Sequence, residues 1–400
     1  MSPLAPIILK KNEDRRIRAG HLWIYSNEID IKKTPLNKFS NGQQALFLDA
    51  KNKPLGTGYV NPHSLICGRL ISRDANILLD RSLLVHRINI ALSVRQRVFD
   101  KPFYRLIFGE SDFLPGLIVD RYNDILVVQI TTAGMEEVKD KIVEALCKVI
   151  KPRGILLRND HNMRSLEHLE NYIEVAYGDV PDEVIVEENN TKFQVPIKTG
   201  QKTGWFFDHR LNRLTMRHFS TDKRVLDLFS YIGGWGVQAA AGGGAREVFC
   251  VDASSVALDH LEQSAKLNNV DDRITCIQGD VFDALKTLRQ EKERFDVIIA
   301  DPPAFIPRKK DIKKGTEAYR RVNQMAMQLL AKDGLLISAS CSYHLDYSTL
   351  KNTLLSCSRH LDRNLQIIHQ GHQGLDHPIH PAVTETDYLK AYFCRVLPVS

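Results

Sequence analysis

The pattern of apolar and polar positions changes twice along the chain. From Leu46 to Ser72, short β-prone runs alternate with Gly, Pro and Asn, which predicts a small β-barrel-like module. Over about residues 80–98, apolar side chains recur at helical spacing and predict a linking helix. Residues 103–190 predict two strands, a helix and two further strands, hence a small α+β domain in which no catalytic pattern stands out.

From residue 191 onward, strand-like and helix-like segments alternate, which is typical of a parallel, doubly wound sheet. We therefore predict an α/β fold: a Rossmann-like, seven-stranded sheet preceded by the β-rich module and the α+β domain. The expected domains are 1–72, 73–190 and 191–400. The expected strands of the sheet are 224–230, 247–253, 274–280, 295–303, 335–343, 365–371 and 388–396.

The formal charge of the chain, +6, is concentrated in its first 72 residues. These carry eleven basic and five acidic side chains, whereas the rest of the chain carries 43 of each. A basic module of this kind suits a polyanionic partner, although an ordinary basic surface would have the same composition. We predict RNA contacts where cations stand beside an aromatic ring, a mixture that suits phosphates and bases and also resembles the start of a PUA domain. The expected RNA-binding residues are Arg15, Arg16, Arg18 and Trp23, with a second basic run at Arg308, Lys309 and Lys310.

Composition excludes several other classes of protein. With 43% apolar and 26% charged residues, the chain suits a globular fold. Its longest uncharged stretch, residues 228–245, contains six glycines and is a poor membrane span, and the N-terminus lacks the features of a signal peptide, so we expect a cytoplasmic protein. The seven cysteines form no CxxC motif, which argues against a zinc ribbon or a disulfide framework. His369, His372, His377 and His380 stand in a Gly- and Pro-rich setting that favours a loop at the active site over a metal centre, so no metal is expected.

A cofactor site is predicted where the first three strands of the sheet end, because ligands of doubly wound folds bind outside the carboxyl ends of strands. The Gly-x-Gly-x-x-Ala run from Gly234 formally matches a dinucleotide fingerprint, and NAD is therefore the rival cofactor. The acidic Asp227 before the glycine turn instead favours S-adenosylmethionine, with Asp252 placed to accept the ribose hydroxyls and Asp280 the adenine amino group. The expected binding residues of this region are Asp227, Phe229, Ser230, Gly233, Asp252 and Asp280.

The fourth and fifth strands end in residues that can carry chemistry. Asp301 opens the run DPPAF, whose prolines suit an exposed turn that can grip a flipped-out base. Cys341 follows the fifth strand, so its thiol and the Asp301 carboxylate are expected in one crevice. Carbon 5 of a pyrimidine is too weak a nucleophile to attack a sulfonium methyl directly, but a thiolate that adds at carbon 6 turns the ring into a reactive enamine. The pair therefore predicts methylation of a pyrimidine carbon.

With these residues in view, the chain resembles the bacterial family of 23S ribosomal RNA cytosine-C5 methyltransferases, which have an N-terminal PUA domain and a class I methyltransferase domain. The most specific segment of the resemblance is QKTGWFFDHR, residues 201–210. The resemblance implies that Lys202, Thr203, Phe207 and Arg210 help to bind S-adenosylmethionine, that Cys341 is the nucleophile and that 23S rRNA is the partner. Many related enzymes have a second cysteine beside the fourth-strand aspartate to assist product release, and none stands between residues 276 and 341 here.

Other functions stay open at this point. A purine N-methyltransferase with a structural Cys341, or a non-catalytic RNA-binding assembly factor, would have a similar pattern. The choice of cytosine over uracil rests on the resemblance, because both bases use the same thiol chemistry. The target nucleotide, the base that removes the carbon-5 proton and the oligomeric state, a homodimer included, are not fixed by the sequence.

Overall fold

In the computed structural model, which describes residues 4–399, two units share the chain in alternating segments. The first unit contains the residues up to 182 together with 197–205 and 375–386. The second contains 183–196, 206–374 and the residues from 387 onward. The segment that joins the last two strands of the second unit thus belongs to the first. The three-domain division expected from the sequence stays a prediction.

The first unit begins with a five-stranded sheet in the order β1-β3-β4-β5-β2. Its elements are β1 (Ala5–Ile8), α1 (Arg15–Arg18), β2 (Trp23–Ile24), η1 (Ser26–Glu28), η2 (Leu36–Lys38), β3 (Gln44–Leu48), β4 (Pro54–Val60) and β5 (Gly68–Ser72). Burial alternates along β3, whereas β4 and β5 are buried almost throughout. The inward side chains of this sheet, which include Ile7, Ile24 and Phe47, form a small core of their own. The short strands expected between residues 46 and 72 are present.

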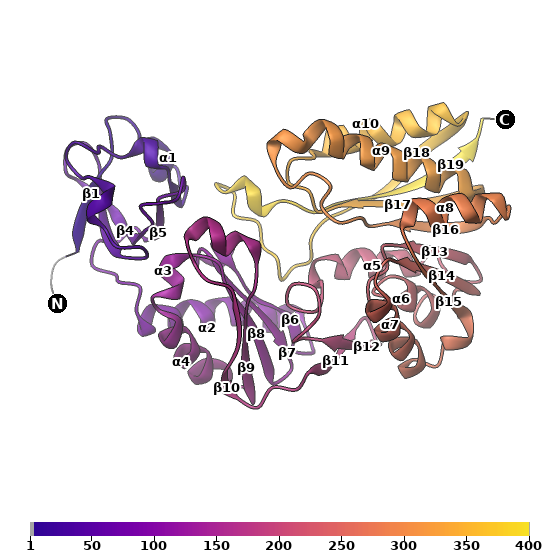
Figure 1. The fold of residues 1–400 in the computed structure, drawn as a ribbon, viewed down its shortest axis with the longest axis horizontal. Helices are drawn as coiled ribbons and strands as arrows, with labels where there is room; N and C mark the ends of the chain where they lie inside the picture. Colours follow the sequence, from indigo (N-terminus) through magenta and orange to yellow (C-terminus); the bar gives the residue numbers. More distant parts are fainter. Residues whose placement is uncertain (1–3, 400) are drawn as a thin grey trace. The chain divides into compact units, whose positions relative to one another are not determined.

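The rest of the first unit is built on a second five-stranded sheet in the order β10-β9-β8-β7-β6. Its elements are α2 (Arg81–Val98), β6 (Phe103–Phe108), η3 (Gly109–Asp112), β7 (Leu117–Tyr122), β8 (Ile125–Ile130), α3 (Ala133–Glu136), α4 (Lys139–Ile150), β9 (Gly154–Asn159), η4 (Asn162–Glu167), β10 (Tyr172–Gly178) and η8 (Thr384–Thr386). The helices α2 and α4 lie side by side against this sheet (Figure 1). Strand β6 is one that the sequence pattern did not predict.

The second unit contains a seven-stranded sheet in the order β15-β14-β13-β16-β17-β19-β18. Its strands are β13 (Arg224–Leu228), β14 (Glu247–Asp252), β15 (Ile274–Gln278), β16 (Phe295–Ala300), β17 (Leu330–Ser340), β18 (Arg363–Gly371) and β19 (Lys390–Pro398). All seven predicted strands are found. The sheet is mixed rather than wholly parallel, because β19 inserts antiparallel between β17 and β18.

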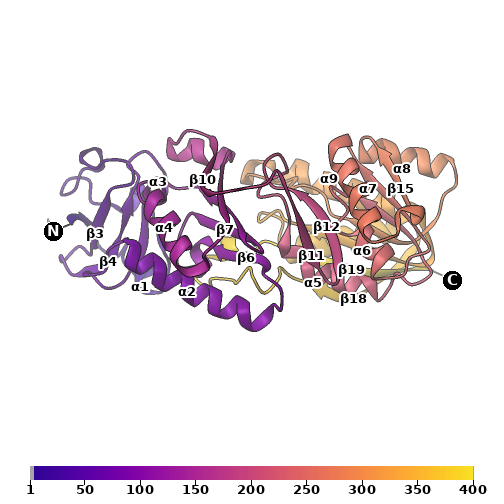
Figure 2. The ribbon, with the colours of Figure 1, turned by 90° about the horizontal axis from the view of Figure 1, so that it is seen from below.

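Helices cover both faces of this sheet, as the alternation of strands and helices requires. The helical elements are η5 (Phe207–His209), α5 (Arg210–Arg217), α6 (Gly236–Ala241), α7 (Ser255–Leu267), η6 (Asp271–Arg273), α8 (Val281–Gln290), η7 (Lys309–Asp311), α9 (Ile312–Leu329) and α10 (Tyr347–His360). The helices α5, α6 and α7 lie on one face, and α8, α9 and α10 on the other (Figure 1). A hairpin of β11 (Glu183–Glu188) and β12 (Thr191–Pro196) packs on α7 (Figure 2), where the backbone N–H of Gln194 donates to Ser264 Oγ at 3.1 Å.

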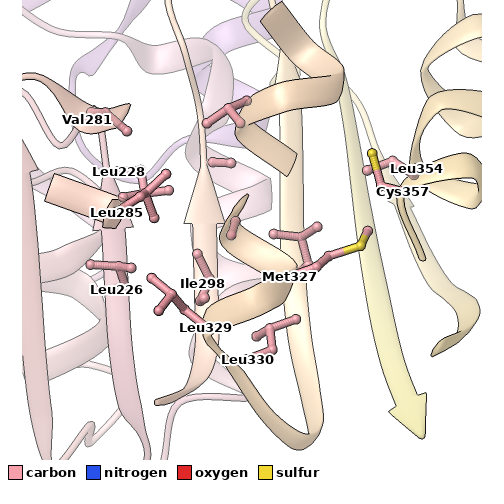
Figure 3. Close-up of a cluster of buried hydrophobic side chains, with 14 of the residues drawn as sticks. Leu226, Leu228, Val281, Leu285, Ile298, Met327, Leu329, Leu330, Leu354 and Cys357 are labelled. Atoms are coloured by element: carbon pink, nitrogen blue, oxygen red, sulfur yellow. The ribbon is translucent and has the colours of Figure 1, made fainter. Parts of the chain in front are cut away.

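One large apolar core fixes the α8–α10 face to the sheet. Leu226 of β13 and Ile298 of β16 face Leu285 of α8 and Leu329 of α9, all nearly inaccessible to solvent (Figure 3). Each buried side chain of this size contributes about 1.5–3 kcal/mol relative to an exposed one. This rigid packing holds the carboxyl ends of the strands in place. No helix within residues 4–399 combines the length and the apolar character that crossing a membrane requires.

The strand order reverses at β13, since the chain winds outward from this strand to β14 and β15 on one side and to β16 and β17 on the other. Such a switch point opens a crevice at the carboxyl edge of a parallel sheet, because the connections on either side leave in opposite directions. The segments that follow β13 and β16 therefore border the same crevice.

Candidate active site

The loop after β13 has an unusual backbone. Phe229, Tyr231 and Gly233 have φ angles of +63°, +49° and +85°. Left-handed conformations cost about 1–3 kcal/mol for residues other than glycine and persist only where their surroundings impose them. Here the N–H of Ser230 donates to the carbonyl of Val251 at 3.0 Å, and the N–H of Gly233 donates to that of Ser230 at 2.9 Å. The loop is thus held against β14, and such strain is typical of ligand-binding segments.

Asp227, near the end of β13, is completely buried beneath this loop. Its Oδ2 accepts the N–H of Gly236 at 2.8 Å, whereas Oδ1 has no hydrogen-bond partner among the described residues. Burial raises the pKa of Asp227 well above its usual value. The buried hydroxyl of Ser230 also lacks a partner in the described part of the chain. Two orphaned polar groups at the glycine turn fit a ligand that carries hydrogen-bonding groups, as S-adenosylmethionine does.

Two further carboxylates stand at the ends of the neighbouring strands. Asp252, the last residue of β14, accepts the N–H of Tyr231 on Oδ2 and that of Ser254 on Oδ1, at 2.8 and 2.9 Å. Asp280 is exposed and caps α8, since its Oδ1 accepts the N–H of Phe282 at 2.9 Å. Each carboxylate oxygen has two lone-pair sites, so these bonds leave acceptors for hydroxyl or amino groups of a ligand.

Asp301, the first residue after β16, is held by two side chains that the sequence did not predict. Its Oδ2 accepts the indole N–H of Trp235 at 3.0 Å, and its Oδ1 lies 3.3 Å from His209 Nε2. Desolvation raises the pKa of Asp301, but the contacts with His209 and Trp235 outweigh it and lower the pKa below its usual value. The side-chain amide N–H of Asn212 points to His209 Nδ1 at 3.1 Å, which leaves Nε2 to carry the proton toward Asp301. Asp301 is therefore an ionised acceptor.

Cys341 follows β17 directly and is partly exposed. The buried Ser340 and Ser342 on either side of it both bond to the hydroxyl of Tyr319 on α9, each at 2.9 Å. Ser342 Oγ also accepts the N–H of Ile306 at 3.2 Å. This bond ties the turn that contains Cys341 to the segment that follows Asp301. Burial and the nearby Cys341 raise the pKa of Tyr319 to about 12, so this phenol stays neutral and holds the turn in place.

A chain of aromatic rings joins the glycine loop to the DPPAF segment. The rings of Phe229 and Phe305 meet edge to face with centroids 6.2 Å apart, and those of Phe305 and Tyr319 with centroids 5.0 Å apart. Such pairs contribute about 0.5–1.5 kcal/mol beyond their burial. The expected cofactor loop and the expected base-binding turn therefore lie at one place in the second unit.

Phe207 and Arg210 belong to the segment before β13. Phe207 is completely buried, with the guanidinium carbon of Arg210 lying 5.2 Å from its ring centroid. Arg210 Nε lies 3.5 Å from Glu188, a buried carboxylate that also accepts Arg213 Nε at 2.7 Å. This cluster fixes the start of α5 to the β11–β12 hairpin, so both predicted residues stand in the second unit with the glycine loop.

Lys202 and Thr203 lie in the first unit instead. Thr203 is completely buried, its hydroxyl donates to Asp120 Oδ2 at 2.5 Å, and its carbonyl accepts the hydroxyl of Tyr122 at 3.0 Å. Lys202 is exposed and has a φ of +49°. Their predicted role in cofactor binding stays a prediction.

The predicted RNA-binding residues of the N-terminal module differ in the hydrogen bonds and ion pairs that they make within the protein. Arg16 donates to both carboxylate oxygens of the buried Glu28, at 2.8 and 3.0 Å, and Arg18 bridges two aspartates. The indole N–H of Trp23 donates to Glu110 at 2.9 Å. Arg15 is exposed, and within residues 4–399 no ion pair engages it. Arg15 is therefore the cation of this set that is most available to a phosphate.

The second basic run lies between the DPPAF segment and α9. Arg308 pairs with Asp311 at 3.0 Å, while Lys309 and Lys310 are exposed. Their position one short segment beyond Asp301 suits contact with the backbone of a nucleic acid whose base reaches the turn.

The four histidines near the C-terminus are dispersed. His369 packs edge to face on Phe393, and His372 Nδ1 lies 3.3 Å from the hydroxyl of Tyr347, whereas His377 and His380 belong to the first unit. In the part of the chain that the structure describes, no group of three or more His, Cys, Asp or Glu side chains could hold a metal ion.

The sequence analysis overlooked His209, Trp235 and Lys390. His209 and Trp235 stand inside motifs singled out for the cofactor, but nothing local links them to Asp301, which is 66 residues beyond Trp235. Lys390 lies on β19, the strand next to β17, beside the turn that contains Cys341. Its backbone pairs with Ser340, and its ammonium donates to the carbonyl of Ser342 at 2.8 Å.

Comparisons with known proteins match both the N-terminal module and the domain that contains this site. The profile of the PUA-like domain matches residues 7–73, and that of the S-adenosylmethionine-dependent methyltransferases matches residues 158–391. Ribosomal RNA large subunit methyltransferase I of Aliivibrio fischeri (strain MJ11) is 35% identical over 396 residues, covering 98% of this chain and 99% of that protein. The protein of the same name from Vibrio cholerae is 34% identical over 399 residues, with the same coverage.

The fold is shared with solved structures as well. A methyltransferase structure, SMU.776 in complex with S-adenosylhomocysteine, superposes with a TM-score of 0.84 at 21% identity, covering 98% of this chain and all of that one. At this identity the likeness shows the fold alone. The profile match and the full-length relatives together show that the chain belongs to the S-adenosylmethionine-dependent methyltransferase family, with a PUA-like domain at its N-terminal end.

Proposed function

We propose that this methyltransferase transfers a methyl group from S-adenosylmethionine to carbon 5 of a cytosine in 23S ribosomal RNA, through a covalent bond between Cys341 Sγ and carbon 6 of the base. The names of the full-length relatives support ribosomal RNA of the large subunit as the substrate. The PUA-like domain supports RNA as the partner, and a substrate of this kind agrees with the cytoplasm as the site of action.

The observation that carries the proposal is that Cys341 and Asp301 stand at the same edge of the sheet. The two residues follow the neighbouring strands β17 and β16 at the same edge of the sheet, and the bond from Ile306 to Ser342 joins their segments. A methyltransferase that modifies a ring nitrogen uses a lone pair and needs no thiol. A thiol beside a base-binding carboxylate is required for attack on a pyrimidine carbon.

The ionisation of Asp301 favours cytosine over uracil. Cytosine presents an amino group at carbon 4, which donates hydrogen bonds, whereas uracil presents a carbonyl oxygen there. An ionised carboxylate can only accept, and His209 and Trp235 hold Asp301 in that form. Asp301 in this proposal binds the amino group and orients carbon 6 toward the thiolate.

The remaining predicted residues take their places around this reaction. Asp227, Phe229, Ser230 and Gly233 would form the floor of the cofactor site, because they shape the glycine loop and its two orphaned polar groups. Asp252, which ends β14, and Asp280, which lies beyond the end of β15, would hold the nucleoside end of the cofactor. When bound, S-adenosylmethionine supplies the methyl group on a sulfonium that needs no further activation.

The test is to identify the methylated nucleoside. Purified protein is incubated with S-adenosylmethionine and 23S rRNA from cells that lack the gene, and the digested RNA is analysed by mass spectrometry. We expect 5-methylcytidine with the wild type and with Cys276→Ala, a control at another partly buried cysteine, and none with Cys341→Ala. A methylated purine, or full activity in Cys341→Ala, would show that the proposal is wrong.

A further inference from the structure

A buried lysine lies beside the turn that contains the proposed nucleophile. Lys390 is the first residue of β19 and pairs in antiparallel register with Ser340, the residue before Cys341. Its Nζ donates to the carbonyl of Ser342, the residue after Cys341, at 2.8 Å. The lysine thus contacts the turn at both ends. Only 2% of its surface is exposed.

The surroundings of Lys390 are unusual for an ammonium group. Burial lowers the pKa of Lys390 to about 8, and the nearby Cys341, Asp387 and Asp346 each act in the opposite direction. The ring of Tyr347 on α10 lies 5.8 Å from Nζ. An ammonium has three N–H groups, and in the described part of the chain one of them has an identified acceptor. A buried lysine with spare hydrogen-bonding capacity, near a thiol, is able to gain and lose a proton close to neutral pH.

We propose that Lys390 is the base that removes the carbon-5 proton after methyl transfer, a step that rests on the proposed function. The reaction requires such a base because the methylated intermediate holds both a proton and the new methyl group on carbon 5. In related enzymes that have a second cysteine beside the fourth-strand aspartate, the thiol of that second cysteine assists release of the product. That position here belongs to the DPPAF segment, and Lys390 stands on β19, which borders β17 on the side opposite to β16.

The proton balance of the cycle is complete with the groups named. Before reaction, Lys390 is an ammonium and stabilises the Cys341 thiolate. The thiolate adds to carbon 6, and carbon 5 then takes the methyl from the sulfonium, which leaves as a neutral thioether. Cys341 is now bonded to carbon and has lost its negative charge, so the main charge that favours the ammonium is gone and Lys390 releases its proton to solvent.

In the last step the neutral amine of Lys390 takes the proton from carbon 5. The electrons of that C–H bond form the double bond between carbons 5 and 6, and the bond from carbon 6 to Sγ breaks with its electrons on sulfur. The thiolate and the ammonium are both restored. One proton has entered the solvent for each methyl group transferred, as replacement of hydrogen by a methyl from a sulfonium requires.

The test separates adduct formation from adduct release. Lys390→Arg keeps a cation beside the thiolate but cannot act as a base near neutral pH, and Lys390→Met removes both properties. Lys351→Met, at an exposed lysine of α10, is the control. Each protein is incubated with 23S rRNA and with S-adenosylmethionine that carries tritium in its methyl group. Covalent protein–RNA adducts are then resolved on denaturing gels. RNA that contains 5-fluorocytidine is used in parallel, because fluorine cannot leave as a proton and traps the adduct in any enzyme able to form it.

We expect Lys390→Arg to form the 5-fluorocytidine adduct like the wild type. On unmodified RNA its turnover should fall by about 100-fold or more, the range expected when a general base is lost, while an adduct that carries the tritiated methyl accumulates. Lys390→Met should in addition form the 5-fluorocytidine adduct slowly. Ethylamine should restore turnover to Lys390→Ala, which a purely structural role would not allow.

Turnover near that of the wild type in Lys390→Arg, or a loss of turnover without a methylated adduct, would overturn the role of Lys390. If the variants fail to fold, rapid quenching of the wild type decides instead: decay of its methylated adduct should accelerate as pH rises, and a decay rate independent of pH refutes the proposal. Absence of any 5-fluorocytidine adduct with the wild type would refute the proposed function itself. The two failures are therefore distinguishable.

Discussion

A methyl group added at Gly236 offers a sharp test of how the glycine turn is built. The Cβ of an alanine there would lie 2.4 Å from Cys250 Sγ, 3.2 Å from Asp227 Oδ2 and 3.3 Å from Val248 Cγ1. Carbon and sulfur atoms in van der Waals contact are separated by about 3.5–4 Å, so the overlap with sulfur exceeds about 1 Å. Cys250 is completely buried on β14, so its thiol can leave this position only within the packed core.

The magnitude follows from two opposing effects. Overpacking a core by one methyl group costs about 1–3 kcal/mol. The preference for alanine over glycine, about 0.5–1 kcal/mol inside a helix, counts only in part at Gly236, the first residue of α6. We therefore expect Gly236→Ala to lower the free energy of unfolding of the second unit by about 1–2 kcal/mol. It should also weaken binding of S-adenosylmethionine, because a shift of α6 that relieves the overlap disturbs the bond from the N–H of Gly236 to Asp227.

The assay is a double-mutant cycle with Cys250→Ala, read by hydrogen exchange of the amides of β13 and β14. Removal of the sulfur makes room for the new methyl group, so the double variant should recover about 1–2 kcal/mol relative to the sum of the single changes. Cys276→Ala is the matched control. Cys276 stands opposite Cys250 on the neighbouring strand β15, but none of its atoms is among the three nearest to the added methyl group. Equal destabilisation with and without Cys250, or rescue by Cys276→Ala, would refute the reasoning.

Four further predictions concern charge. Because burial raises the pKa of Asp227 in the folded protein, the wild type loses stability as pH rises from the unfolded value of about 3.9 toward the folded one. Asp227→Asn should therefore melt higher than the wild type at pH 8, and the gap should narrow steadily as pH falls toward about 3.9. Arg15→Ala should weaken RNA binding and reduce the slope of log affinity against log salt by about 1, as measured by filter binding. Arg16→Ala should instead lower the melting temperature, because it leaves a buried carboxylate unpaired. Lys309→Ala combined with Lys310→Ala should reduce the same salt slope by about 2 without a change in melting temperature.

The periodicity of the chain predicted the main elements of the fold and missed others, of which the hairpin β11–β12 and strand β6 are instructive. The hairpin β11–β12 was missed although a signal exists: Asn189 and Asn190, the two residues between its strands, both have positive φ, as the tight turns of hairpins require and asparagine tolerates. Strand β6, FYRLIF, was missed although Pro102 and Gly109 flank it, because its apolar residues do not alternate clearly with polar ones.

Part of the candidate site was predictable for a local reason. A residue such as Asp227, Asp252 or Asp301 can be assigned to a strand end from its place in the sequence, since a buried apolar run must end where the chain leaves the core. The carboxyl ends of parallel strands share one edge, so the sequence pattern is enough to predict that these side chains lie together.

The partners of these residues could not be predicted in this way. The contact of Asp301 with His209 and Trp235 joins segments separated by as many as 92 residues, and the proximity of Lys390 to Cys341 depends on β19 inserting antiparallel between β17 and β18. Alternation along a strand sets which side chains are buried but carries no information on which strand lies next to it. The sequence alone thus determined the strands, their ends and the reactive side chains placed there, whereas the order of strands, chosen by packing across the whole sheet, decided which of them meet.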